Sequence, residues 1–363
     1  MSTTALHPSL PLELPQPMLP MAPPPPLALP EPEADTRSRR KHLWIAAVST
    51  ITVIALLVGL VFHGYVAWML AHPYVAPLHS NPKDAIGLDY TAATFPSASG
   101  RTTVDAWYVP AADDGGRVSS RGAALPSTRT VIFSHGYGAN REETWVPMYT
   151  LTSLLHGLHY NVLMFDYGYA SKEHKAPATG GWEEAKQLLA AVDYAKGQGA
   201  EDITVWGFSM GAGTALQAAL QTDEIDAMIL DSLFLPSSEA LFNNLRQFVE
   251  LPRFPSLPLI EAILPVWTGT SFGGIPAEQV LATAYDMPIY IVHGTEDAKA
   301  PFQTAEAIST GQSDPLSRSW IVPGGKHELL FQVHPQEYIQ RAALFLGQVD
   351  GKLQAERSLA MAH

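Results

Sequence analysis

Short apolar runs alternate with stretches of helical composition between residues 84 and 350. The runs are rich in β-branched and aromatic residues, and several show little alternation of apolar and polar residues, as do strands covered on both faces. This rhythm predicts an α/β fold with a doubly wound, mostly parallel sheet of eight strands. The expected strands are 103–109, 129–134, 161–166, 202–206, 226–231, 288–293 and 318–322, with a weaker candidate at 86–92.

The stretches between these strands predict helices on both faces of the sheet. We expect them at 144–156, 182–196, 210–221, 301–310 and 335–346. The rhythm breaks between 232 and 287, where the chain is apolar, rich in proline and partly helical at 237–250. We interpret 232–287 as a short helical insertion that could act as a lid; ordinary packing helices are the alternative.

An uncharged apolar segment lies ahead of this region. Residues 43–62 carry no charge, and the uncharged stretch continues to residue 70. Twenty helical residues span about 30 Å, the thickness of the hydrocarbon core of a bilayer. The segment is longer than the apolar part of a cleaved signal peptide and follows a polar region of about 40 residues. Because no amphipathic period favours a buried core helix, we expect 43–70 to be a transmembrane signal anchor.

The charges around the anchor predict its orientation. Arg37, Arg39, Arg40 and Lys41 precede it, and the first basic residue after it is Lys83. The positive-inside rule therefore places the N-terminus in the cytoplasm and the chain after about residue 72 outside it. Residues 1–42 contain eleven prolines and are expected to be a disordered tail, to which a proline-reading protein domain could dock. The folded domain is expected at 71–350, followed by a C-terminal tail at 351–363.

Composition excludes several classes of function. The formal net charge is −13, all of it after residue 42, and an acidic domain repels nucleic acid phosphates. The chain has no cysteine, which removes disulfides, thiolate catalysis and zinc–sulfur sites. Neither an H-E-x-x-H motif nor clustered metal ligands occur. We therefore expect no nucleic acid partner, no metal and no cofactor.

The pattern G-x-S-x-G occurs twice, around Ser209 and around Ser271. A nucleophile elbow needs a strand, a sharp turn and a helix, and flanking glycines let the backbones approach closely. An expected strand, 202–206, precedes Ser209, and an expected helix, 210–221, follows it. Ser271 has no strand before it and a proline soon after. The context therefore predicts Ser209 as the nucleophile.

A serine nucleophile needs a base, which in turn needs an orienting carboxylate. His327 follows the last expected strand, and Asp297 follows the strand at 288–293. The order serine, aspartate, histidine is that of hydrolases in which the triad lies at the carboxyl edge of a parallel sheet. We predict His327 as base and Asp297 as the orienting group, with Glu296 and Asp231 as the alternative carboxylates.

Two backbone amides are expected to bind the oxyanion. One belongs to Met210, which follows the nucleophile at the start of a helix. The other belongs to Tyr137, in the sequence HGYG after the strand at 129–134. His135 of the same sequence is interpreted as a structural residue.

From about residue 84 to 347 the chain resembles the α/β-hydrolase superfamily, because HGYG, GFSMG, HGTED and GGKHE occur in the order and strand context of that family. It is most similar to bacterial single-span hydrolases of the esterase or dienelactone-hydrolase type, which are related to Bem46-like membrane hydrolases. The resemblance implies a triad of Ser209, Asp297 and His327, with Tyr137 and Met210 as oxyanion donors. It departs from the family at Ala300, often a valine, and at 166–170, where D-x-R-G-x-G is common.

Together these features predict a serine hydrolase that cleaves a carboxylic ester or thioester without a cofactor. The anchor and the apolar insertion suggest a lipophilic acyl substrate near the membrane. A membrane-bound peptidase or amidase is one alternative, because the same triad serves several chemistries. A non-catalytic, hydrolase-like binding module is the other.

Overall fold

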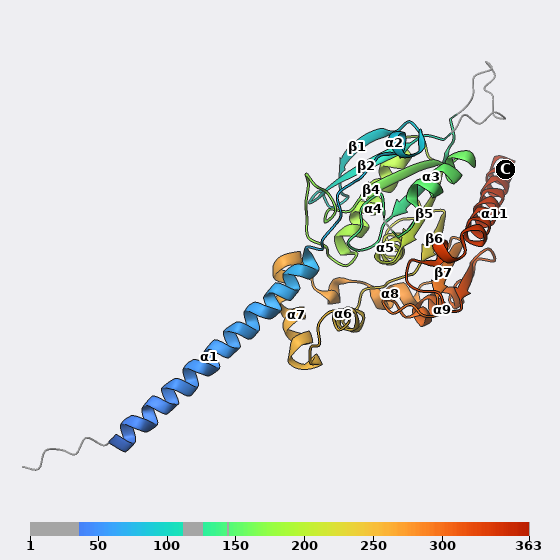
Figure 1. The fold of residues 1–363 in the computed structure, drawn as a ribbon. Helices are drawn as coiled ribbons and strands as arrows, with labels where there is room; N and C mark the ends of the chain where they lie inside the picture. The colour runs from blue at the N-terminus through green and yellow to red at the C-terminus, as the bar shows by residue number, and fades with distance from the viewer. Residues whose placement is uncertain (1–35, 112–125, 144, 363) are drawn as a thin grey trace, which may run out of the picture. The chain divides into compact units, whose positions relative to one another are not determined.

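The computed structural model describes residues 36–111, 126–143 and 145–362 (Figure 1). Residues 1–35 of the predicted proline-rich tail lie outside the described residues. Helix α1 (Thr36–Ala71) follows, so residues 36–42 of that predicted tail are helical. Within the described part of the chain, Arg37–Ala71 is the one helix that is long and apolar enough to cross a membrane. By its internal contacts the chain divides into residues 1–56 and 57–363, and the second of these units contains the whole sheet.

A mixed sheet of eight strands forms the centre of the second unit. The strand order is β1-β2-β4-β3-β5-β6-β7-β8. The first two strands pair antiparallel with each other, and β2 pairs antiparallel with β4, whereas every other neighbouring pair is parallel. The bounds are β1 Thr91–Pro96, β2 Thr103–Val109, β3 Arg129–Ser134, β4 Asn161–Asp166, β5 Asp202–Phe208, β6 Ala227–Asp231, β7 Ile289–Gly294 and β8 Arg318–Val322.

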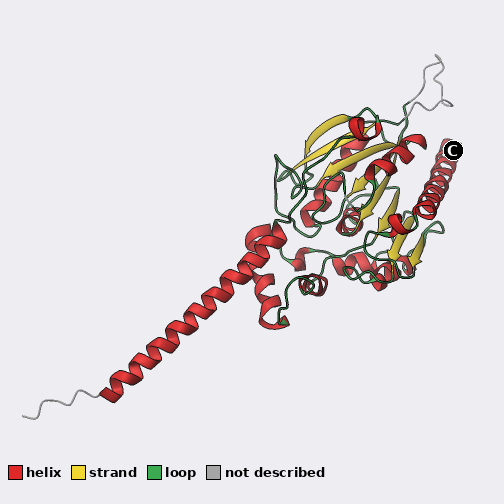
Figure 2. Cartoon of the chain, in the orientation of Figure 1, coloured by secondary structure: helices red, strands yellow, loops and turns green. Residues whose placement is uncertain are grey.

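Helices cover both faces of this sheet (Figure 2). One apolar core lies under α4 (Trp182–Gly197), α5 (Met210–Ala219) and α9 (Phe302–Thr310). A second core lies on the other face, under α3 (Met148–Gly157) and α11 (Pro335–Met361). Strands β3 to β6 contribute buried side chains to both cores, which explains their near-continuous apolar sequences. The predicted doubly wound α/β sheet is therefore confirmed.

The first strand is the one strand position that the sequence predicts wrongly. Residues 82–86 form the short helix α2 (Pro82–Ile86), and β1 begins only at Thr91. The helix has a proline at its start, and the Asn81 side chain accepts a hydrogen bond from the amide of Asp84. Gly87 then ends the helix in the left-handed conformation, at φ 72°. These capping interactions determine the local structure and override the apolar pattern at 86–92.

Two helices also differ from the predicted bounds. Helix α3 begins at Met148 rather than at 144. Helix α11 continues to Met361 and so includes residues 351–361 of the tail expected at 351–363. The extension is tied to the sheet, because Arg357 binds the carboxylate of Asp202, at the start of β5, with two guanidinium nitrogens. A bidentate pair of this kind fixes orientation as well as charge.

The insertion at 232–287 is helical. It comprises α6 (Ser238–Leu245), α7 (Arg253–Thr268), the short 3₁₀ turn η1 (Phe272–Gly274) and α8 (Ala277–Ala282). Helix α6 is shorter than the predicted 237–250. The insertion contacts the loop after β7, where Asn244 and Gln247 donate to the carbonyls of Lys299 and Ala298 at 2.9 and 2.8 Å.

The C-terminal end of α1 belongs to the second unit and packs on it. Val66, Ala67 and Ala71 are buried. The carbonyl of Ala71 accepts a hydrogen bond from the amide of Ala178 at 2.7 Å. The last residues of α1 are thus part of the second unit.

Candidate active site

Ser209 lies in the sharp turn between β5 and α5, with φ 52° and ψ −119°. This backbone conformation is strained for a residue with a side chain. The two flanking glycines make it possible. A Cβ added at Gly207 would lie 2.6 Å from the Cα of Ala212, and one added at Gly211 would lie 2.0 Å from the carbonyl oxygen of Ser134. The local sequence therefore forms a nucleophile elbow.

The three predicted triad residues come together at the carboxyl edge of the sheet. The Oγ of Ser209 lies 2.9 Å from the Nε2 of His327. The Nδ1 of His327 lies 2.6 Å from Oδ2 of Asp297. All three side chains are largely buried. These distances suit a serine that donates to a histidine base and a histidine that donates to a carboxylate.

The surroundings of Asp297 keep it ionised. Its side chain accepts hydrogen bonds from the amides of Lys299 and Ala300, at 2.9 and 2.8 Å. The buried Nε2 of His293 lies 3.3 Å from the same Oδ2 that His327 contacts. Burial opposes ionisation, but hydrogen bonds from His293 and His327 outweigh it and lower the pKa of Asp297. An ionised carboxylate only accepts, so Nδ1 of His327 carries the proton and Nε2 is free to act as base.

The rival residues lie in other environments. Asp231 is fully buried and accepts hydrogen bonds from the hydroxyls of Tyr338 and Ser232, at 2.6 and 2.8 Å. Burial raises the pKa of Asp231. Glu296 is exposed, and Ser271 is exposed on the insertion between α7 and η1. The geometry thus places Asp297, rather than Asp231 or Glu296, against His327.

The two predicted oxyanion donors flank Ser209. Met210 is the first residue of α5, and the amides of the first turn have no acceptor within a helix. Gly136, which precedes Tyr137, approaches Ser209 so closely that an added Cβ would lie 3.4 Å from the Cβ of Ser209. Among the turns and loops that the structure describes, the amide of Tyr137 donates to no backbone carbonyl. This arrangement leaves both amides available to an oxyanion.

Buried contacts hold the loop after β3, residues 135–143, in place. His135 accepts a hydrogen bond from the amide of Tyr167 through Nε2, at 3.0 Å, and burial lowers its pKa to about 4. Arg141 binds the carboxylate of Asp166 through its backbone amide, at 2.7 Å, and its guanidinium, at 2.8 Å. These contacts are consistent with the interpretation of His135 as a structural residue, which stays a prediction.

The end of α1 also holds this loop, which the sequence did not reveal. The hydroxyl of Tyr137 donates to the carbonyl of Leu70 at 2.7 Å. Asn140 donates to the carbonyl of Ala76 at 2.8 Å. The carboxylate of Glu142 accepts from the amides of the segment after α1, those of His79 and Ser80. The predicted oxyanion loop is therefore fastened to the residues that follow the apolar helix.

A second carboxyl group beside the triad was also missed. Glu328 is buried and has φ 58°, and its Oε1 lies 3.7 Å from the Nε2 of His327. Burial raises the pKa of Glu328 to about 7; the charge of His327 opposes the rise and that of Glu143 adds to it. The carboxylate of Glu143 accepts a hydrogen bond from the amide of Gly136 at 3.1 Å. The only signal for Glu328 in the sequence was its position directly after His327.

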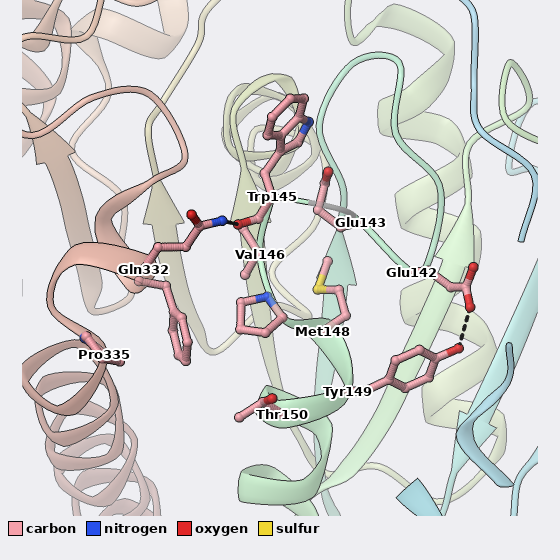
Figure 3. Close-up of a pocket in the computed structure, with 11 residues that line it drawn as sticks. Glu142, Glu143, Trp145, Val146, Met148, Tyr149, Thr150, Gln332 and Pro335 are labelled. Carbon is pink, nitrogen blue, oxygen red and sulfur yellow. Dashed lines mark hydrogen bonds between the residues drawn. The ribbon is translucent and has the colours of Figure 1, made fainter. Parts of the chain in front are cut away.

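A hollow of about 590 Å³ lies beside the site. The oxyanion loop, the start of α3 and the segment 331–335 line it. Figure 3 shows the hydroxyl of Tyr149 directed at Glu142, at 2.7 Å, and the Gln332 amide directed at the carbonyl of Trp145, at 3.2 Å. The hollow adjoins the site through Glu143 but includes none of the triad, so its position alone assigns no substrate to it. In the described residues no group of three or more His, Asp or Glu side chains is placed to hold a metal ion.

Comparisons with known proteins support the fold. Residues 129–263 match the model of the alpha/beta hydrolase fold family. Two curated relatives are named uncharacterized proteins: YfhR of Escherichia coli K12 is 26% identical over 234 residues, covering 64% of this chain and 71% of the relative. YqkD of Bacillus subtilis is 26% identical over 225 residues, covering 60% of this chain and 70% of the relative.

Solved structures show the same fold. The Pyrococcus furiosus esterase Pf2001 superposes with a TM-score of 0.60 at 22% identity, over 77% of this chain and 97% of the esterase. The alpha/beta hydrolase GrgF from Penicillium superposes with a TM-score of 0.51 at 16% identity, over 72% of this chain and 99% of GrgF. At these identities the likeness establishes the fold and leaves the substrate open.

Proposed function

We propose that this chain, which belongs to the α/β-hydrolase superfamily, is a serine hydrolase that cleaves a carboxylic ester or thioester through an acyl-enzyme on Ser209. The observation that carries the proposal is the unbroken hydrogen-bonded series from Ser209 through His327 to Asp297, at 2.9 and 2.6 Å. The strained serine backbone and the two oxyanion amides beside it provide further support.

The residues divide the reaction between them. As the Oγ of Ser209 attacks the acyl carbon, its proton passes to Nε2 of His327, and the ionised Asp297 stabilises the resulting imidazolium. The amides of Tyr137 and Met210 bind the negative charge that develops on the carbonyl oxygen. His327 then returns the proton to the leaving group. In the second half, a water loses its proton to His327 and attacks the acyl carbon of the acyl-enzyme. The bond from that carbon to the Oγ of Ser209 then breaks, His327 returns the proton to the Oγ, and the acid is released.

We further propose that the protein acts at a membrane on a lipophilic acyl substrate. The support is the apolar helix Arg37–Ala71, the basic residues that precede its apolar part, and the contact of its C-terminal end with the oxyanion loop. In this placement the N-terminus lies in the cytoplasm and the site lies on the opposite side. The peptidase or amidase alternative uses the same triad and differs only in the leaving group.

A panel of acyl compounds tests the proposal. The full chain, reconstituted in phosphatidylcholine vesicles, would be given nitrophenyl esters of two to sixteen carbons, matched thioesters and matched anilides. We expect turnover of the esters or thioesters that rises with chain length and disappears in Ser209→Ala. Faster cleavage of acetyl and butyryl esters than of chains of eight or more carbons would contradict the lipophilic substrate. Cleavage of the anilides alone would favour the amidase.

A further inference from the structure

Helix α7 is apolar on both its inner and its outer face. Its buried residues include Leu257, Ile260 and Leu264, which face the rest of the domain. The other residues from 258 to 267 are also apolar apart from Glu261, although they are exposed or partly exposed. The apolar outward residues include Pro258, Leu259, Ala262, Ile263, Val266 and Trp267. A helix that is apolar around most of its circumference is normally buried in protein or in lipid.

The exposed apolar surface extends beyond α7. Val266 is 76% exposed and Trp267 is 41% exposed. Phe248, in the turn before α7, and Phe254, at its start, are both 81% exposed. We call these four residues the lid face. Single exposed apolar residues are ordinary, whereas a group on one insertion marks an interaction surface.

A row of stacked rings joins the lid face to the apolar helix. Tyr65 stacks on Trp68 with their centroids 5.9 Å apart, and Trp68 stacks on His72 at 5.2 Å. The ring of His72 then meets Trp267 edge-on at 6.4 Å. Tryptophan and tyrosine concentrate where a span leaves the hydrocarbon for the headgroups. The row therefore puts Trp267 at the level where α1 would emerge from a bilayer.

We propose that the lid face is a membrane-docking surface, with α7 lying in the interfacial layer of the bilayer that α1 crosses. The inference rests on the membrane placement in the proposed function. The contact of Trp267 with His72, at the end of the emerging helix, favours lipid rather than a soluble partner as the occupant. Interfacial helices of this kind insert their apolar side to the boundary between headgroups and acyl chains. The insertion at 232–287 would then present the site to acyl chains in that layer.

Because the chain contains no cysteine, single labels can test this docking in the full protein. Val266→Cys and Leu344→Cys would each carry an environment-sensitive nitrobenzoxadiazole label in phosphatidylcholine vesicles. Leu344 is a matched control, since it is an apolar residue that is 57% exposed, on α11. Leu57→Cys, in the apolar helix, serves as the reference for immersion.

We expect lipids with nitroxide-bearing acyl chains to quench at least half of the emission at positions 266 and 57, and little at 344. Equal quenching at 266 and 344, or none at 266, would overturn the inference. Fluorophosphonate labelling of Ser209 in the same vesicles separates the two proposals. Quenching at 266 without labelling of Ser209 would support the docking surface and refute the serine hydrolase. Labelling of Ser209 without quenching at 266 would support the serine hydrolase and refute the docking surface.

An unlabelled variant excludes insertion caused by the dye. Val266→Asp puts a charge into the lid face while leaving the triad and the oxyanion amides untouched. We expect hydrolysis of a long-chain ester held in the vesicles to fall at least tenfold, with hydrolysis of a soluble short-chain ester unchanged. Equal rates for the variant and the wild type on the vesicle-held ester would refute the docking surface.

Discussion

Replacing Glu328 by glutamine removes a buried carboxyl group beside the histidine base and preserves its size. Burial raises the pKa of Glu328 from the usual 4.5 to about 7, so the fold favours the protonated form. The stability that this form contributes is complete below pH 4.5 and is lost as the pH rises through 7. The difference between the two pKa values corresponds to about 3 kcal/mol in the free energy of unfolding. Glutamine has no charge to bury, so Glu328→Gln does not lose this stability at high pH.

Thermal unfolding in detergent at pH 4.5 and pH 8.5 measures this difference. We expect Glu328→Gln and the wild type to unfold at similar temperatures at pH 4.5. At pH 8.5 the variant should be the more stable, by up to about 5–10 °C for a domain of this size. Glu296→Gln is the matched control: it removes a nearby exposed carboxylate and should shift neither value. A wild type that gains stability over Glu328→Gln as the pH rises would refute the reasoning.

Three further substitutions test other parts of the site. In Asp297→Asn the amides of Lys299 and Ala300 keep the side-chain oxygen, so the NH2 group faces Nδ1 of His327 and favours the wrong tautomer. We expect kcat to fall about 10³–10⁴-fold with little change in KM; a loss below tenfold in steady-state ester hydrolysis would remove Asp297 from the triad. Gly211→Ala places a Cβ 2.0 Å from a backbone oxygen of β3 and should destabilise the fold by at least about 2 kcal/mol in urea unfolding. The control is Gly347→Ala, whose new Cβ has no atom within 4 Å and which should stabilise the fold by about 0.5–1 kcal/mol. Tyr137→Phe loses the hydrogen bond to Leu70 but keeps its amide, so we expect unfolding to become easier by about 1 kcal/mol and kcat to fall less than tenfold; an unchanged unfolding midpoint would mean that the contact does not hold the loop.

The sequence predicted the sheet well because its central strands are buried on both faces. Strands β2, β3 and β4 begin and end at the predicted residues. The edge strand β8 does so too, although it is only partly buried. An apolar run of limited length between turn residues has few other uses. The edge strand β1 was misplaced because it is largely exposed, which removes the apolar signal, while the caps of α2 made a helix nearby.

The candidate triad was predictable because each member follows a strand of a parallel sheet. The carboxyl ends of such strands share one edge, so chain order and strand context suffice to bring Ser209, Asp297 and His327 together. Contacts between distant segments could not be predicted in this way. The hydrogen bond from Tyr137 to Leu70 joins residues far apart in the chain and has no local pattern. The burial of Glu328 depends on packing that no single segment determines.

Covalent labelling tests the central claim most directly. The full chain in vesicles would be treated with a fluorophosphonate probe, beside Ser209→Ala and Ser271→Ala, and the modified residue identified by peptide mass spectrometry. Ser271 is the matched control because it lies in the second G-x-S-x-G sequence. We predict labelling of the wild type and of Ser271→Ala at Ser209, and none of Ser209→Ala. A folded wild type that remains unlabelled, or a label on Ser271, would contradict the assignment of Ser209 as the nucleophile.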